Sequence, residues 1–304
     1  MNVEKIGLIG LGRMGKNLAL NMIDNGFSVV VYNRTKEKTE DFVKETSHEG
    51  AYTLKEFVEK LPVPRVVWIM IPSGEPTESM IDKLSSLLSE GDIIIDGGNS
   101  FYQDTLRRNK KLQEKGIRFL DVGTSGGVEG ARNGACYMIG GNKSAFDLLE
   151  PLFEKTSVKN GYGYFGKSGN GHFIKMVHNG IEYGMMQVTG EGFEILKKYD
   201  NNLDFEKVAR VWSNGSVIRG WLMELTQRMF SKDPSLKNVP SEIGQSGEGL
   251  WTLQEALHQN ISTPVIAASI FRRFDSQKNF DFSTKVIQGL RKEFGGHGTE
   301  VRLK

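Results

Sequence analysis

A chain of 304 residues, with 38% hydrophobic and 25% charged residues, has the composition of a globular protein of one or two domains, which excludes a peptide module or a disulfide-stapled miniature. Its 39 basic and 37 acidic residues leave a net charge of +2, so we predict no nucleic acid as a partner. A single cysteine, Cys136, excludes an internal disulfide and a cysteine-rich metal site, and we predict no metal.

The apolar runs of the sequence are short. None approaches the length of a membrane span, and the N-terminus leads into a strand pattern without the apolar core of a secretory signal. We therefore expect no membrane partner and a cytoplasmic location. The chain is also unusual in having 36 glycines against 8 prolines. Because glycine lets the backbone turn tightly or approach a ligand closely, glycine clusters indicate candidate binding loops.

The N-terminal half alternates short apolar runs with amphipathic stretches of helical length. The predicted strands are Lys5 to Gly10, Ser28 to Tyr32, Val66 to Ile71, Asp92 to Asp96 and Arg118 to Val122. Strands joined by helix-length crossovers form a parallel sheet covered by helices on both faces. The sequence therefore predicts an α/β fold, with a Rossmann-type, doubly wound, mostly parallel sheet forming a first domain over residues 1–168.

The alternation disappears after the glycine-rich segment Gly161 to Gly171, which we interpret as a linker. The predicted helices beyond it are Phe173 to Tyr199, Phe205 to Trp212, Ser216 to Phe230, Leu250 to Gln259, Pro264 to Phe274 and Ser283 to Phe294. We therefore predict a second, all-α domain that ends in a tail, over residues 169–304.

The first glycine cluster has the pattern Gly-x-Gly-x-x-Gly between a predicted strand and a predicted helix. The first glycine permits a tight turn, the second lets a pyrophosphate approach the backbone at the helix N-terminus, and the third lets the helix pack on the strand. A plain glycine-rich turn is the alternative, but the flanking strand and helix favour a dinucleotide site. The predicted cofactor-binding residues here are Gly10, Leu11, Gly12, Arg13, Met14 and Gly15.

The second predicted strand ends in Asn33, Arg34 and Thr35, where an NAD enzyme usually has an acidic residue for the ribose 2′-hydroxyl. A guanidinium beside an amide and a hydroxyl suits a 2′-phosphate, through charge-assisted hydrogen bonds. The alternative is that Arg34 is only a solvated charge. We predict NADP as the cofactor, with NAD as the alternative, and therefore an NADP-binding domain over residues 1–168.

Two further glycine clusters follow predicted strands, at Asp96 to Ser100 and at Thr124 to Arg132. In an open parallel sheet the carboxyl ends of the strands line the ligand crevice. Asn99 and Ser125 could orient a polyhydroxylated substrate or the nicotinamide amide. The alternative is that both clusters are merely sharp turns.

The first helix after the linker has an unusual polar face. Lys175, His178, Asn179, Glu182 and Tyr183 lie at helical spacings on one side. Packing is expected from the opposite positions Met176, Val177, Ile181 and Met185. Each polar residue alone could be structural or solvated, but a whole polar face favours an active site. We predict Lys175 as a general base and Glu182 as a general acid, about 10 Å apart along the helix axis.

These motifs together resemble those of the decarboxylating 6-phosphogluconate dehydrogenases, members of the β-hydroxyacid dehydrogenase superfamily. The segment His172 to Tyr183 is the most specific, and the length is similar to that of the short bacterial branch. The resemblance implies oxidation of 6-phospho-D-gluconate at C3 and loss of C1 as CO₂. The products are ribulose 5-phosphate and a reduced nicotinamide, in the pentose phosphate pathway and gluconate utilisation.

The resemblance also implies that the helical domain of residues 169–304 serves substrate binding and dimerisation, and it implies roles for individual residues. Lys175 takes the proton from the C3 hydroxyl and then assists decarboxylation, and Glu182 protonates C1 of the resulting enediol. The sugar acid is held by Asn99, Ser125, Gly126, Gly127, His178 and Asn179. Its phosphate is held by Tyr183 and Arg273, and further cofactor contacts come from Ile71, Pro72, Ser73 and Asn99.

The C-terminal segment Arg291 to His297 resembles the one that family members insert into a neighbouring subunit's site. Arg291 and His297 are therefore expected to complete a shared substrate site in a homodimer or higher homo-oligomer. A basic tail of no consequence is the alternative. Two positions depart from the long enzymes. Glu248 lies in a segment where those enzymes have a lysine and a threonine that hold the substrate phosphate. Pro72 stands where many of them have a lysine beside the cofactor.

Two other functions compete with this one. The first is a β-hydroxyacid dehydrogenase that acts on a smaller substrate without decarboxylation. It would not be expected to combine His178 and Glu182 with the Arg291 and His297 tail. The second is a nucleotide-binding regulatory protein without catalysis, against which the intact pair Lys175 and Glu182 argues.

Overall fold

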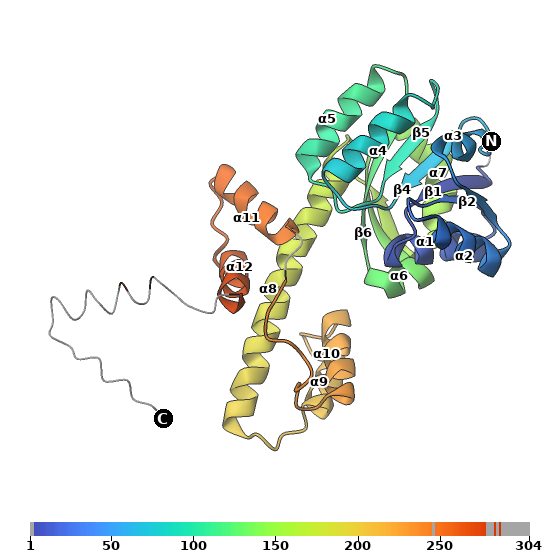
Figure 1. Ribbon diagram of the computed structural model, residues 1–304. Coiled ribbons are helices and arrows are strands. Elements are labelled where there is room, and N and C mark those ends of the chain that lie inside the picture. The colour runs from blue at the N-terminus through green and yellow to red at the C-terminus, as the bar shows by residue number, and fades with distance from the viewer. Residues whose placement is uncertain (1–2, 245–246, 278–282, 284–285, 287–304) are drawn as a thin grey trace. The chain divides into compact units, whose positions relative to one another are not determined.

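The computed structural model describes residues 3–244, 247–277, 283 and 286 (Figure 1). The chain divides into two compact units, residues 1–180 and residues 181–304. The division at residues 168 and 169 that the sequence suggests stays a prediction.

The first unit is built on one eight-stranded sheet with the order β3-β2-β1-β4-β5-β6-β7-β8. The strands are β1 (Lys5–Ile9), β2 (Ser28–Tyr32), β3 (Glu49–Ala51), β4 (Val66–Ile69), β5 (Ile93–Asp96), β6 (Arg118–Ser125), β7 (Ala135–Gly141) and β8 (Ser157–Tyr164). Strands β1 to β6 pair in parallel, β7 is antiparallel to β6, and β8 is parallel to β7. The order reverses between β1 and β4, and this is where doubly wound sheets bind their ligands.

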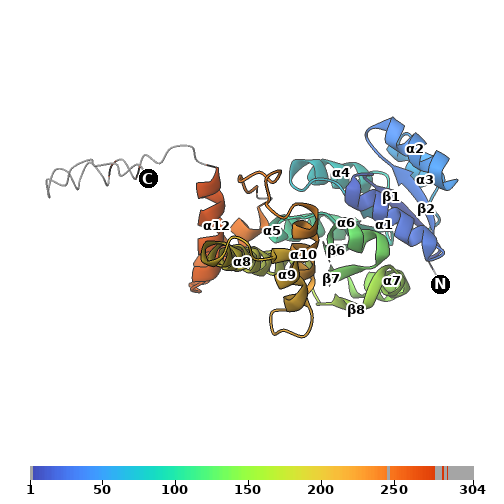
Figure 2. The ribbon, with the colours of Figure 1, turned by 90° about the horizontal axis from the view of Figure 1, so that it is seen from below.

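Helices cover both faces of this sheet (Figure 2). They are α1 (Arg13–Asp24), α2 (Lys36–Thr46), α3 (Leu54–Glu59), α4 (Glu75–Ser85), α5 (Tyr102–Gln113), α6 (Gly127–Asn133) and α7 (Lys143–Thr156), followed by the long α8 (Asn170–Tyr199). Alternate strand residues point to opposite faces, so the unit has two cores. In β5, Ile93 and Ile95 enter the core under α1 and α7, whereas Ile94 enters the core under α3, α4 and α5. The predicted fold class is confirmed.

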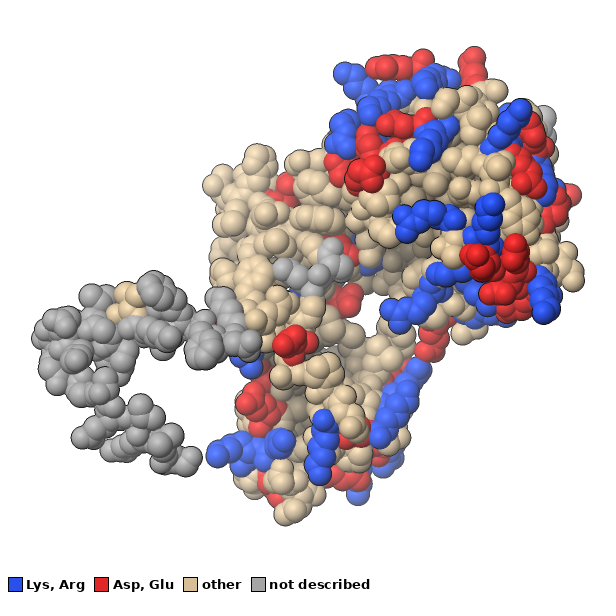
Figure 3. All heavy atoms as spheres, in the orientation of Figure 1, with Lys and Arg blue, Asp and Glu red and all other residues tan. Residues whose placement is uncertain are grey.

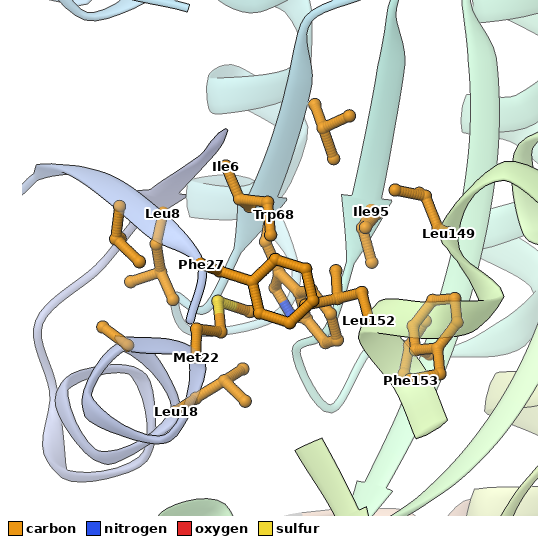
Figure 4. Packing of buried hydrophobic residues seen from close by; sticks show 14 of the residues in the cluster. Ile6, Leu8, Leu18, Met22, Phe27, Trp68, Ile95, Leu149, Leu152 and Phe153 are labelled. Carbon is orange, nitrogen blue, oxygen red and sulfur yellow. The ribbon is translucent and has the colours of Figure 1, made fainter. Parts of the chain in front are cut away.

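One of the two cores is centred on aromatic side chains. Trp68 of β4 is fully buried, and its ring centroid lies 5.7 Å from that of Phe153 of α7 and 5.8 Å from that of Tyr137 of β7. Figure 4 shows side chains of α1 and α7 meeting those of β1, β4 and β5 in this core. Burial of an aromatic side chain contributes about 2 to 3 kcal/mol, so this layer stabilises the packing of α7 on the sheet.

Three strands were not predicted from the sequence: β3, β7 and β8. Strand β3 has only three residues, and β7 follows β6 after the seven-residue helix α6, which is shorter than the crossover of a parallel unit. Strand β8 lies at the sheet edge and none of its residues is fully buried, so its sequence lacks hydrophobic alternation. The interpretation of Gly161 to Gly171 as a linker is therefore wrong in part, because Gly161 to Tyr164 belongs to β8.

The second unit is helical in its described residues. After the end of α8 come α9 (Phe205–Ser213), α10 (Trp221–Lys232), α11 (Glu248–His258) and α12 (Pro264–Ser276). Phe193 of α8 packs with Phe230 of α10, and their ring centroids are 5.0 Å apart. The helix predicted from Ser216 begins only at Trp221, after Gly220 at a φ of 150°. The helix predicted over 283–294 lies outside the described residues, apart from 283 and 286.

The apolar side of α8 differs from the expectation. Met176 is buried, but Ile181 and Met185 are 53% and 51% exposed. The prediction that these two side chains pack against this chain is therefore wrong for the described residues.

Lysine and arginine side chains are interspersed with acidic ones over the face shown in Figure 3. None of the described helices has both the length and the apolar character that a membrane crossing requires.

Candidate active site

The glycine-rich loop after β1 forms a close-packed turn at the point where the strand order reverses. Gly10 has a φ of +102°, and a Cβ atom there would lie 2.4 Å from the carbonyl oxygen of Met70. A Cβ at Gly15 would lie 1.9 Å from the carbonyl oxygen of Gly10. By contrast, a Cβ at Gly12 would meet no atom within 4 Å, so the backbone is open on that side. Because α1 begins at Arg13, its N-terminal N–H groups and this open backbone fit a pyrophosphate.

Asn33 and Arg34 have different roles at the end of β2. The side-chain oxygen of Asn33 accepts a hydrogen bond from the Leu11 N–H at 2.9 Å, and its amide nitrogen donates to the carbonyl of Thr35 at 3.0 Å. Asn33 thus ties the glycine-rich loop to the end of β2. Arg34 and Thr35 are exposed there, in a position that suits a ribose 2′-phosphate.

The loop after β5 folds around a buried carboxylate. Asp96 Oδ1 accepts from the Gly98 N–H at 3.1 Å, and Asp96 Oδ2 accepts from Ser100 Oγ at 2.7 Å. Asn99 lies between these two anchored residues and is exposed. The loop after β4 lies against it, because a Cβ at Gly98 would be 3.0 Å from the carbonyl oxygen of Ile71.

The loop after β6 turns sharply at two glycines. Gly126 and Gly127 have φ values of +107° and +59°, a region that residues with a side chain rarely adopt. Helix α6 begins at Gly127. The turn leaves Ser125, at the end of β6, with its Oγ 3.2 Å from His178 Nε2.

Four of the predicted site residues form one hydrogen-bonded cluster in the first unit. Lys175 Nζ donates to Asn179 Oδ1, and His178 Nδ1 lies 2.9 Å from the same oxygen. Because an amide oxygen only accepts, this arrangement places the proton of a neutral His178 on Nδ1 and leaves Nε2 to accept from the Ser125 hydroxyl. Lys175 and Asn179 are 7% and 8% exposed. A buried amine is thus held in a defined position beside groups that can bind hydroxyls.

The N-terminus of α8 is anchored by Asp121, a residue that the sequence analysis did not single out. Asp121 of β6 is buried, and its carboxylate accepts from the Gly169 N–H at 2.8 Å, the His172 N–H at 3.0 Å and Ser168 Oγ at 3.3 Å. A carboxylate at the positive end of a helix is favourable, and here it comes from a strand. The signal in the sequence was an acidic residue inside an apolar run, two residues before Gly123.

Two of the predicted substrate residues meet in the second unit. The guanidinium of Arg273 lies 3.7 Å from the ring centroid of Tyr183, and Arg273 Nη1 donates to the Gly244 carbonyl at 2.8 Å. Glu248 is buried at the first residue of α11, and a Cβ at Gly249 would come within 2.5 Å of the Tyr183 ring. Glu182 precedes Tyr183 on α8 and is partly buried.

The remaining predicted residues lie in the loop after β4 and in the C-terminal segment. Arg291 and His297 lie outside the described residues. Ile71 and Ser73 are partly buried and Pro72 is exposed, all in the loop after β4. Among the described residues, no group of three or more histidine, cysteine or acidic side chains could hold a metal ion. The Cys136 thiol is free, and burial raises its pKa against the opposing charge of Lys175.

Comparisons with known proteins agree over nearly the whole chain. Residues 5–166 match the NAD-binding domain of 6-phosphogluconate dehydrogenase, and residues 171–281 match its C-terminal domain. YqeC of Bacillus subtilis, provisionally assigned as a 6-phosphogluconate dehydrogenase, is 50% identical over 298 residues, which are 98% of this chain and 100% of that protein. The NAD-dependent decarboxylating 6-phosphogluconate dehydrogenase of Haloferax volcanii is 38% identical, over 96% of this chain and 97% of its own length.

A solved structure extends the comparison to three dimensions. The 6-phosphogluconate dehydrogenase of Plasmodium falciparum, solved in its apo form and in complexes with NADP⁺ and with 6-phosphogluconate, superposes with a TM-score of 0.82 and 35% identity. The match covers 96% of this chain and 65% of that one. The family models and these relatives confirm the family resemblance, so the chain is an oxidoreductase with an NAD(P)-binding domain and belongs to the 6-phosphogluconate dehydrogenase family.

Proposed function

We propose that this protein oxidises 6-phospho-D-gluconate at C3 and releases C1 as CO₂, yielding ribulose 5-phosphate. The observation that carries the proposal is the buried amine of Lys175, held by Asn179 beside His178 and Ser125. The named activity of the Haloferax and Plasmodium relatives supports it. The product places the reaction in the pentose phosphate pathway.

Lys175 supplies the base for the first step and an acid for the second. When bound, the nicotinamide cofactor supplies the acceptor for the hydride that leaves C3. Neutral Lys175 takes the C3 hydroxyl proton as that hydride departs, so a 3-keto acid forms. The protonated amine then stabilises and protonates the C3 oxygen while the bond between C1 and C2 breaks and CO₂ leaves.

Glu182 completes the reaction in this proposal. The enediol that remains after CO₂ departs needs a proton on the carbon that becomes C1 of the ketose. Glu182, seven residues after Lys175 on α8, donates that proton, while Lys175 takes the proton of the neighbouring hydroxyl to give the ketone. Both groups then return to their starting states by proton exchange with water.

Hydrogen-bonding groups on the loops and on α8 are proposed to orient the sugar acid. Ser125 and His178 already share a hydrogen bond at the end of β6, and Asn99 is exposed on the loop after β5. Tyr183 and Arg273 are proposed to bind the phosphate, because a guanidinium stacked on a ring keeps N–H groups directed outward in its plane. NADP is the proposed cofactor, supported by Arg34 at the end of β2.

A homo-oligomer with shared active sites is part of the proposal. An exposed apolar stripe runs along the second half of α8 at helical spacings, formed by Ile181, Met185, Val188, Ile195 and Tyr199. Such a stripe on a soluble chain indicates a surface for association. Arg291 and His297 are proposed to reach the site of a neighbouring subunit from this assembly.

The test of the proposed function is an initial-rate assay with 6-phosphogluconate and with gluconate, each with NADP and with NAD, in which CO₂ release is measured beside nicotinamide reduction. We expect equal amounts of CO₂ and reduced cofactor from 6-phosphogluconate, and little turnover of gluconate. Reduction without CO₂ would identify a non-decarboxylating dehydrogenase instead.

Two variants assign the chemistry within that assay. Lys175→Met removes the base and is expected to lower kcat by about a thousandfold or more, and Glu182→Gln by about a hundredfold or more, with NADP still bound. An unchanged kcat in Lys175→Met would support a protein without catalysis at this site.

A further inference from the structure

A buried arginine joins two of the loops at the carboxyl edge of the sheet. Arg108 lies in the middle of α5, and its side chain is 1% exposed. Its Nη1 donates to Asp96 Oδ2 at 3.2 Å and to Ser100 Oγ at 3.1 Å, both in the loop after β5. Its Nη2 donates to the Gly74 carbonyl at 3.0 Å, in the loop after β4, and its Nε donates to Glu78 Oε2 at 2.8 Å on α4. One guanidinium therefore contacts both loops and the helix between them.

The two loops are those proposed to hold the cofactor and the sugar acid. Residues 71–73 precede Gly74, and Asn99 lies between Gly98 and Ser100. The loops lie close together at Gly98 and Ile71, because a Cβ on Gly98 would come within 3.0 Å of the Ile71 carbonyl oxygen. Burying a guanidinium and a carboxylate costs free energy that well-packed apolar residues would avoid, so simple stabilisation does not account for this arrangement.

We propose that Arg108 is a positioning residue that sets the spacing between loop 71–74 and loop 96–100, so that cofactor binding and the placement of Asn99 depend on each other. The proposal rests on the proposed function, which assigns ligands to these loops. Arg108 is too deeply buried to touch substrate itself, and it acts through Asp96, Ser100 and Gly74.

The geometry requires an arginine rather than any cation. A guanidinium presents five N–H groups in a rigid plane, and four of the hydrogen bonds here leave from three different nitrogens. A lysine ammonium keeps the charge near Asp96 and Glu78 but cannot span both loops in one plane. Charge neutralisation and loop spacing can therefore be separated by substitution.

The neighbouring Arg107 provides a matched control. It lies on the same helix and also binds Glu78, with Nη2 2.8 Å from Oε2, but its side chain is 51% exposed and its other hydrogen bond goes to Asp104. Arg107→Met removes one arginine and one bond to Glu78 without touching either loop. It thus controls for lost charge and for weakened pairing on α4.

The experiment compares Arg108→Met, Arg108→Lys, Arg107→Met and the wild type. Circular dichroism and the thermal midpoint report the fold, calorimetric titration gives the Kd of NADP without substrate, and initial rates give kcat and KM. For Arg108→Met we expect the Kd of NADP to rise about tenfold and kcat to fall about tenfold or more, with the values of Arg107→Met within about twofold of the wild type. Arg108→Lys, which keeps the positive charge, is expected to have the thermal midpoint of the wild type but the low kcat of Arg108→Met.

Two outcomes would overturn the proposal. One is a folded Arg108→Met protein whose Kd for NADP and kcat stay within twofold of the wild type. The other is full recovery of kcat in Arg108→Lys, since charge alone would then suffice. If the wild type does not turn over 6-phosphogluconate, the proposed function fails, while the Kd of NADP still tests the role of Arg108.

A milder variant covers the case in which Arg108→Met does not fold. Ser100→Ala removes only one hydroxyl of loop 96–100, which donates to Asp96 and accepts from Arg108. We expect kcat/KM for 6-phosphogluconate to fall about fivefold and the Kd of NADP to rise by a smaller factor, about threefold, because loop 71–74 keeps its own bond to Arg108. An unchanged kcat/KM in this variant would contradict the proposal as well.

Discussion

The backbone of Gly123 in β6 lies directly against the side chain of Lys175 in α8. A Cβ atom at residue 123 would come within 2.4 Å of Lys175 Cβ and 2.8 Å of the Gly171 carbonyl oxygen. The position of the proposed base therefore depends on the absence of a side chain on the neighbouring strand. Helix α8 approaches the sheet this closely because Gly171 also has no side chain, and a Cβ there would lie 2.3 Å from the Asp121 carbonyl oxygen.

Gly123→Ala should displace Lys175 and lower activity. Overpacking of this kind costs about 1 to 3 kcal/mol of unfolding free energy, and a shift of the amine by a fraction of an ångström should lower kcat about tenfold or more. Steady-state kinetics and urea unfolding measure the two effects. Gly190→Ala, on α8 like Lys175 but with no atom within 4 Å of the added Cβ, is the control and should leave kcat unchanged. Wild-type kcat in Gly123→Ala would show that Lys175 tolerates the shift.

Asp121→Asn should loosen the start of α8. The amide can accept from only one side, so either the Gly169 or the His172 N–H loses its buried acceptor. We expect a loss of about 1 to 3 kcal/mol of unfolding free energy and a lower kcat, measured by urea unfolding and initial rates. The exposed Asp24→Asn, which breaks only a surface ion pair with Arg132, should change stability by less than about 1 kcal/mol. Equal effects of both substitutions would contradict the capping role.

Glu78 should stabilise the protein only while it is ionised, so its contribution should be lost in acid. Partial burial by itself would raise the pKa of Glu78, but hydrogen bonds from Lys111, Arg108 and Arg107 outweigh it and lower the pKa from 4.5 to about 2. Because the folded pKa lies below the ordinary value, this stabilisation is complete above pH 4.5 and is lost as the pH falls toward 2.

The measurement is urea unfolding at pH 6, 4 and 3 for the wild type, Glu78→Gln and, as an exposed control on α4, Glu75→Gln. At pH 6, Glu78→Gln should be less stable than the wild type by about 1 kcal/mol, allowing for solvent screening, and the difference should shrink as the pH falls. A difference that is constant with pH would exclude titration of Glu78 as the cause.

Arg34→Ala should discriminate between the two cofactors. Loss of a charge-assisted contact to the 2′-phosphate is expected to raise the KM for NADP about tenfold or more, while the KM for NAD, which has no such phosphate, stays within about twofold. NAD is thus the internal control in the same protein. A parallel rise in both values would mean that Arg34 supports the loop rather than recognises the phosphate.

Sequence patterns predicted best those strands whose residues are determined by a single requirement, burial on both faces of the sheet. The apolar runs of β1, β2, β4 and β5 are buried on both faces, so they read as strands without further information. Strand β8 was not predicted because it lies at the sheet edge and has no fully buried residue, so it needs no apolar run. The exposure of Ile181 and Met185 was missed because helical periodicity shows an apolar face without showing what covers it.

The candidate site divides in the same way. Spacing on one helix was enough to group Lys175, His178 and Asn179, because residues three and four apart share a face whatever the tertiary structure. The anchors of that helix and of the loops, Asp121, Gly123 and Arg108, could not be found so, because each acts on residues distant in the sequence.

By itself the sequence determined the local patterns: a parallel sheet of buried strands, a glycine-rich turn before a helix, and a helix with a polar face. These depend on short-range backbone geometry and on which side chains avoid water. The tertiary structure alone decided that a strand glycine makes room for Lys175, that the Asp121 carboxylate caps its helix, and that a buried guanidinium joins two loops. Such contacts form between groups far apart along the chain, and only close packing determines which of them meet.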